Sequence, residues 1–241
     1  MTRAPAAQVE HQMRFREILE RVNRKKAGEA APERQLGPFV TVSRMAGSGG
    51  AEIARRLGER IGWAVLDREL VDGVAEKLKL EPGFLELVDE TRANWFSDTL
   101  YNLLHSRLVL QDSYVEMIGK LILLAAWQGQ VVIVGRGAHL LLPADTGLRV
   151  RIVAPRELRV QRLAAEQGLD RVSAERRLDE VDRAREEYVR RHFGMPAGDP
   201  FDLVLDSGAF GVDGTVELLL RALELRGLLA GPGAQNQARV R

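Results

Sequence analysis

The sequence has no cysteine and few histidines. Without cysteine, the chain can form no disulfide, thiol nucleophile or cysteine-ligated metal centre. The four histidines do not have the spacing of metal ligands; they are His11, His105, His139 and His192. We therefore expect neither a zinc enzyme nor a protein-held metal site.

Strong net charge and long apolar runs are also absent. The net charge of +1 gives no sign of a nucleic acid or an anionic membrane as partner. Residues 1–26 carry charges throughout and lack the apolar core of a secretory signal. The most apolar segment, 117–127, contains Lys120 and is too short to span a bilayer. We expect a cytoplasmic protein with no nucleic-acid partner and no membrane partner.

The composition divides the chain into three parts. In residues 1–36, Phe15, Ile18, Leu19 and Val22 share one face of a predicted helix, and an Ala-, Gly- and Pro-rich linker follows. Residues 227–241 contain glycine and proline without periodicity, which predicts a disordered tail. The segment between them, 37–226, has the size of one α/β domain.

Within 37–226, short apolar runs alternate with helical patterns. Parallel neighbouring strands need crossover connections, so this alternation predicts a three-layer α/β fold with a parallel sheet. Residues 81–127 contain no strand candidate and predict a helical insertion, and residues 155–193 predict two arginine-rich helices, the second capped by Ser173. The predicted strands are 39–42, 63–66, 131–134, 148–153 and 201–206.

A glycine-rich loop, SRMAGSGG (43–50), follows the first predicted strand and opens a helix. Gly47, Gly49 and Gly50 allow backbone N–H groups to form an anion nest, which the helix N-terminus reinforces. The pattern G-x-x-x-x-G-K-[ST] is incomplete, because Gly50, Ala51 and Glu52 stand where its lysine and hydroxyl belong. A glycine turn without a ligand is the alternative, and the role of Glu52, as helix cap or metal ligand, stays open.

Basic residues accompany the predicted carboxyl edge of the sheet, where such folds bind ligands. None of the five lysines lies in the loop, so its cation must be an arginine, and Arg44 and Arg55 are nearest. Arg136 lies between two glycines after the third strand, and Asp67 follows the second. The competing interpretation is a plain turn for Arg136 and a helix cap for Asp67. For the arginines of residues 155–193 it is solvated surface pairs.

Several motifs taken together resemble the bacterial cytidylate kinase-like proteins, relatives of the nucleoside monophosphate kinases. They are VTVSR, GSGG, LDREL, IVGRGA, RVRIVAPRELRVQRL and FDLVLDSG, spread over about Phe39 to Leu225. The resemblance implies a P-loop nucleoside monophosphate kinase fold, in which 81–127 is the insertion and 155–193 is the lid region. It also implies ATP and Mg²⁺ as cofactors and nucleotides as partners.

The resemblance also implies the site residues. The expected catalytic residues are Arg44, Arg136 and Arg191. The expected acceptor-binding residues are Asp67, Arg68, Arg136 and Gly137. The expected cofactor-binding residues are Ser43, Gly47, Ser48, Gly49, Gly50, Ala51, Arg159 and Arg162.

Two functions follow as hypotheses. The first is ATP-dependent phosphoryl transfer to a nucleoside monophosphate, with CMP or dCMP as the expected acceptor. The second is a non-enzymatic nucleotide-binding or sensing module of the same fold. Cytidylate kinases carry a lysine where this chain has Gly50 and an aspartate where it has Gly137, which favours the second; the glycine loop and the arginines favour the first. The acceptor base is open, and so is a homodimer formed through the apolar insertion.

Overall fold

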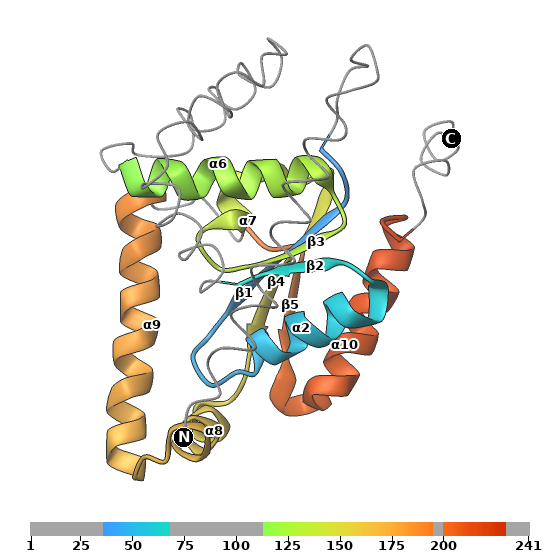
Figure 1. The fold of residues 1–241 in the computed structure, drawn as a ribbon. Coiled ribbons are helices and arrows are strands. Elements are labelled where there is room, and N and C mark those ends of the chain that lie inside the picture. Colours follow the sequence, from blue (N-terminus) through green and yellow to red (C-terminus); the bar gives the residue numbers. More distant parts are fainter. Residues whose placement is uncertain (1–35, 68–112, 195–199, 230–241) are drawn as a thin grey trace, which may run out of the picture.

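The structure, a computed structural model, describes residues 36–67, 113–194 and 200–229 (Figure 1). Five parallel strands form one sheet in the order β2-β3-β1-β4-β5, so that β1 is central. This confirms the predicted parallel α/β sheet of the P-loop nucleoside monophosphate kinase type. The strands are β1 (Phe39–Arg44), β2 (Ala64–Leu66), β3 (Val131–Val134), β4 (Gly147–Val153) and β5 (Leu203–Asp206).

Helices cover both faces of the sheet (Figure 1). On one face, α2 (Gly50–Ile61) and α10 (Ser207–Leu225) contact each other and share a core cluster with Val40 and Val42 of β1. On the other face, α6 (Ser113–Gln128) and the short α7 (Ala138–Leu141) share a second cluster with Phe39. Because consecutive residues of β1 are buried on opposite faces, this strand appears in the sequence as a continuous apolar run.

Two further helices, α8 (Arg156–Gln167) and α9 (Arg171–Phe193), pack against each other beside the sheet. Figure 1 shows α9 along the side of the sheet, with its first residues beside α8 and its last residues beside α6. At the α6 end, Tyr188 and Phe193 pack against the apolar cluster that contains α6. The predicted arginine-rich lid region is therefore a pair of well-formed helices.

Some predicted boundaries differ from the structure. The prediction that Ser173 caps α9 is wrong: Asp170 is the cap, and its side chain accepts a hydrogen bond from the Ser173 N–H. The last helix, α10, begins at Ser207, where the Asp206 carboxylate caps it, and has a kink at Gly211. Leu228 is buried in the core, so the packed fold extends beyond the predicted start of the tail at 227.

Several predicted segments lie outside the described residues. They include residues 1–35 of the appended segment, residues 81–112 of the insertion and residues 230–241 of the tail. The last part of the insertion is described and forms α6. Within the described ranges, no helix is both long and apolar enough to cross a membrane.

An ion pair joins Arg149 of β4 to Asp202, the residue before β5. This pair should make the stability of the fold depend on pH. Burial alone would raise the pKa of the Asp202 carboxyl, but hydrogen bonds from the Arg149 guanidinium and backbone N–H hold that pKa below its usual value. The carboxylate therefore stabilises the fold above the unfolded-state pKa of about 3.9. This stability is lost as the pH falls through the lower folded-state pKa.

We expect Asp202→Asn to lower the free energy of unfolding by about 1–2 kcal/mol at pH 7, because the charge-assisted bonds to Arg149 are weakened. Urea unfolding of both proteins between pH 7 and pH 2 measures the effect. The difference between the two proteins should shrink below about pH 4. A difference that stays constant down to pH 2 would contradict this account.

Candidate functional site

The loop from β1 to α2 lies at the carboxyl edge of the sheet and depends on glycine. Gly47 and Gly49 have φ angles of 68° and 75°, in the left-handed region that favours glycine. A Cβ atom at Gly47 would also clash with the carbonyl group of Arg159 on α8. The predicted glycine turn is therefore shaped both by its backbone and by the close approach of α8.

The N-terminus of α2 carries no side-chain cap. Gly49 is the N-cap residue, and no side chain of the described chain accepts a hydrogen bond there. The first-turn N–H groups of a helix have no partner within the helix, and together with the helix dipole they attract anions. This end of α2 therefore has the donors and the charge needed to hold a phosphate group.

Glu52 does not cap the helix. Its carboxylate accepts hydrogen bonds from Arg56 (2.6 Å) and Arg55 (2.8 Å) on the exposed face of α2. The bond from Arg56, with a further one from Arg55, holds the pKa of Glu52 below its usual value although burial opposes this. Arg55 also pairs with Glu59, so Arg55 is engaged on the helix surface.

The second half of the loop is tied to α8 and α10. The Ser48 hydroxyl donates to the Met45 carbonyl (2.8 Å), and the Ser48 carbonyl accepts from the Ser207 hydroxyl (2.6 Å). Arg162 donates to that same Ser207 hydroxyl (3.1 Å). A Cβ atom at Gly49 would lie 3.6 Å from Arg162 Nη1, so this predicted phosphate contact does lie beside the loop.

The first half of the loop is tied to α9 by a carboxylate. Asp182 Oδ1 accepts from the Ala46 N–H (2.7 Å), and Asp182 Oδ2 accepts from Arg159 Nη1 (2.6 Å). Arg159 is only 5% exposed and also donates to the Ala154 carbonyl. Because its charge is buried, the pairing with Asp182 is required for Arg159 to remain in this position.

A cleft of about 1240 Å³ lies between the start of the loop, the end of β3 and α9. Ser43 and Gly137 line it, and so does His139, whose ring stacks on Phe201. Basic side chains outnumber acidic ones in the lining, which favours an anionic ligand. The basic residues are Arg44, Arg136, Arg151, Arg177, Arg183, Arg185 and Arg190; the acidic ones are Glu180, Asp182, Glu186 and Glu187.

Arg136 is held in a strained turn at the end of β3. It has a φ angle of 54° and lies between two glycines that also have positive φ angles. Its guanidinium lies over the Tyr188 ring, 5.4 Å from the ring centroid. A Cβ atom at Gly137 would clash with the Phe193 ring. The turn therefore packs against the end of α9 and places Arg136 in the cleft.

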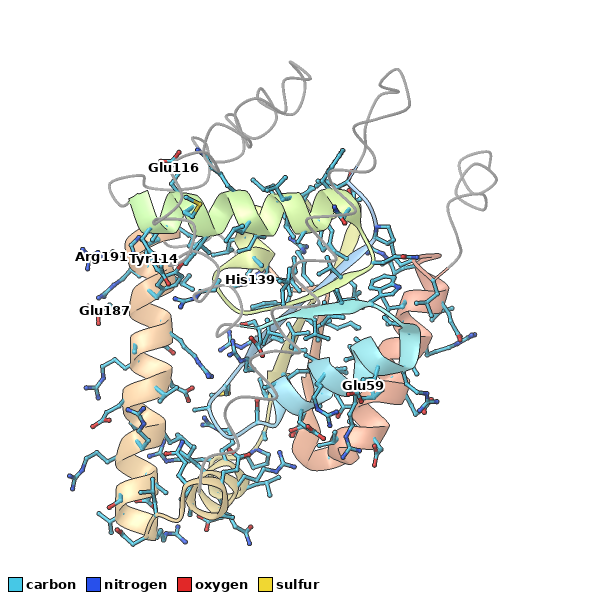
Figure 2. The ribbon with its side chains drawn as sticks, viewed as in Figure 1. Glu59, Tyr114, Glu116, His139, Glu187 and Arg191 are labelled. Atoms are coloured by element: carbon cyan, nitrogen blue, oxygen red, sulfur yellow. The ribbon has the colours of Figure 1, made fainter. Side chains whose placement is uncertain are left out.

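Two further predicted residues, Arg191 and Asp67, are not among the residues that line the cleft. Arg191 is exposed, and Figure 2 shows it beside Glu187, which does line the cleft. Its predicted catalytic role stays a prediction. Asp67 directly follows β2. Arg68 lies outside the described residues, so its predicted role stays a prediction.

Several residues of the site were missed by sequence reasoning. None of these residues was singled out. Arg151 lies within the motif RVRIVAPRELRVQRL and His139 directly follows IVGRGA, whereas Asp182 and Arg185 stand in a helix crowded with charges. The one usable signal was the three-residue spacing of Asp182 and Arg185, which places both on one helix face. That spacing is common on surface helices and could not reveal that their partners are Ala46 and Arg44 of the loop.

The strand order and the glycine loop after the central strand define the class of the protein as a P-loop kinase fold. The sequence model of the cytidylate kinase-like family matches residues 39–209. The chain belongs to this family.

Two curated relatives are cytidylate kinases. The one from Methanopyrus kandleri is 30% identical over 111 residues, which cover 42% of this chain and 58% of the relative. The one from Archaeoglobus fulgidus is 23% identical over 195 residues, which cover 78% of this chain and 95% of the relative. The chain thus spans little more than half of the first relative and nearly all of the second.

A solved structure of an uncharacterized protein from Eubacterium ventriosum is also similar. Its TM-score is 0.61 at 22% identity, and the match covers 78% of this chain and 98% of that protein. The likeness shows that the fold is shared.

We expect Asp182→Ala to lower the free energy of unfolding by about 3 kcal/mol, because it leaves the buried Arg159 charge without its carboxylate. Urea unfolding at pH 7 measures this. Asp179→Ala is the matched control on the same helix: Asp179 pairs with Arg156, and both side chains are about half exposed. Its effect should be much smaller, and equal losses in the two variants would contradict the role given to Asp182.

Proposed function

We propose that the protein transfers the γ-phosphoryl group of ATP to a nucleoside monophosphate, with CMP or dCMP as the preferred acceptor. One observation carries this proposal: the glycine loop opens the uncapped α2 helix directly beside an arginine-lined cleft of about 1240 Å³. The family membership supports the reaction class. The two cytidylate kinases among the relatives support the choice of acceptor.

The donor phosphates fit the loop. Backbone N–H groups around Gly47, Gly49, Gly50 and Ala51, with the α2 dipole, would hold them, and Arg162 lies beside Gly49. Ser48 is fully buried and bonded within the loop, so it shapes the loop through its backbone.

Mg²⁺ fits the described residues less well than the phosphates do. Across the described ranges, no three His, Asp or Glu side chains group closely enough to hold a metal ion, and Ala51 offers no hydroxyl. Phosphate oxygens and water are ligands that Mg²⁺ commonly keeps. When bound in this way, the ion would neutralise phosphate charge, and the protein would contribute its arginines.

The acceptor fits the cleft. Arg136 is fixed there by its turn and by Tyr188, and Gly137 leaves the space that Phe193 fills. Asp67 and Arg68 are proposed to reach the acceptor from the end of β2. Phosphoryl transfer depends on positioning and on neutralising charge rather than on a covalent nucleophile. An arginine-rich cleft therefore suits this reaction.

A second function has its own support. Arg159, a proposed phosphate ligand, is buried and already paired with Asp182. The Ala46 N–H of the loop is bonded to the same carboxylate. A protein that binds a nucleotide without turnover, and responds through the contact between α9 and the loop, is the alternative proposal.

A coupled assay of ADP release from ATP, with CMP, dCMP, UMP and AMP as acceptors, separates the two proposals. We expect ADP release that depends on an acceptor and is fastest with CMP or dCMP. Titration calorimetry with ATP is run in parallel. ATP binding without turnover of any acceptor would support the sensing module, and absence of ATP binding would contradict both proposals.

We expect Arg136→Ala to lower kcat/KM for the acceptor roughly a hundredfold, because it removes a fixed cation from the cleft. Arg191→Ala is the comparison variant. Since Arg191 is exposed outside the cleft, its loss should change kcat/KM less than the loss of Arg136. Steady-state kinetics measure both, and a larger loss in Arg191→Ala would show that α9 turns Arg191 into the site.

A further inference from the structure

The loop departs from the phosphate-binding pattern at its first position as well as at the lysine position. When Gly49 takes the last glycine of G-x-x-x-x-G-K-[ST], Gly50 takes the lysine position and Arg44 takes the position of the first glycine. The chain has therefore lost a cation at one end of the loop and carries one at the other end. The two positions are six residues apart in sequence.

The structure brings these two positions into contact. A Cβ atom at Gly50 would lie 2.5 Å from Arg44 Cβ and 3.2 Å from Arg44 Cγ. The position of Arg44 Cβ is set by the backbone of the last residue of β1, so no rotation of the side chain can move this atom away. Gly50 is the first residue of α2 and has no positive φ angle. Contact with Arg44 is therefore what excludes a side chain at position 50.

The other end of Arg44 reaches the cleft. A Cβ atom at Gly135 would clash with Arg44 Nη1, so the guanidinium lies beside the end of β3. Arg44 and Gly135 both line the arginine-rich cleft. The side chain thus extends from the start of α2 to the cleft, through space that a side chain at position 50 would enter.

The backbone of Arg44 is fixed as well. It pairs with Ile152 of β4, and its carbonyl accepts a hydrogen bond from Arg185 Nη1 (2.9 Å). An arginine in this position is permanently charged and can hold two phosphate oxygens at once. A lysine ammonium also has several donors, but they come from a single point charge rather than from a planar fork.

We propose that the cation and the glycine of a phosphate-binding loop have exchanged places in this chain: Arg44 stands at the position of the first glycine, and Gly50 stands at the position of the lysine. The Arg44 guanidinium then supplies the missing charge to the nucleotide phosphates. This inference rests on the proposed function, because it names the cation of the same site. Arg44 and a lysine at position 50 are then mutually exclusive. The loop can carry either one, but not both.

The test uses the full chain with Arg44→Gly, Gly50→Lys, the double variant Arg44→Gly/Gly50→Lys, and Arg44→Ala/Gly50→Lys. ATP affinity is measured by calorimetry in Mg²⁺ buffer, and the unfolding temperature is measured without nucleotide. Arg44→Gly should weaken ATP binding roughly ten- to hundredfold, because a charge-assisted contact is lost. Gly50→Lys should lower the unfolding temperature through its clash with Arg44.

The double variants decide the proposal. Arg44→Gly/Gly50→Lys should bind ATP more tightly than Arg44→Gly and should unfold at a higher temperature than Gly50→Lys. Arg44→Ala/Gly50→Lys should remain destabilised, because alanine keeps the Cβ atom that causes the clash. Arg55→Ala, which removes an arginine paired on the outer face of α2, should leave ATP affinity unchanged.

Two results would overturn the exchange while leaving the proposed function intact. One is an Arg44→Gly variant that binds ATP as the unaltered protein does. The other is a double variant that regains neither affinity nor unfolding temperature. If the unaltered protein binds no ATP, the proposed function fails and the role of Arg44 in binding fails with it.

Discussion

The carboxylate of Asp182 is the contact on which the arrangement of the site depends. It accepts a hydrogen bond from the loop at Ala46 and forms an ion pair with the buried Arg159 of α8. One side chain of α9 thereby links this helix to both the loop and α8. Because α9 forms one wall of the cleft, this contact also sets where its inner arginines lie relative to the loop.

The loop is consequently divided into two parts with different roles. Its first part, from Arg44 to Ala46, is bonded to α9 through Arg185 and Asp182. Its second part, from Gly47 to Gly50, has left-handed glycines and leads into a helix without a side-chain cap. The first part positions the Arg44 side chain, and the second part presents backbone donors. Phosphate binding needs both charge and donors, and here they come from opposite ends of one loop.

Local sequence patterns predicted the fold well. The apolar runs of the parallel strands reflect a pattern within a few residues, so periodicity reveals them. Asp182 could not be found in this way, because Ala46 lies 136 residues away in the chain. Sequence patterns also could not show which arginines of α9 line the cleft, because that depends on how the helix packs. Arg185 and Arg190 line it, and the catalytic role predicted for Arg191 stays a prediction.

The central claim is that this loop holds nucleotide phosphates with Arg44 in the role of the absent lysine. A crystal structure of the protein with a non-hydrolysable ATP analogue and CMP tests it most directly. The account predicts the analogue's phosphates at the N–H groups of residues 47–51, with the Arg44 guanidinium at about 2.7–2.9 Å from phosphate oxygens. Phosphates bound away from this loop, or an Arg44 side chain turned away from them, would contradict it.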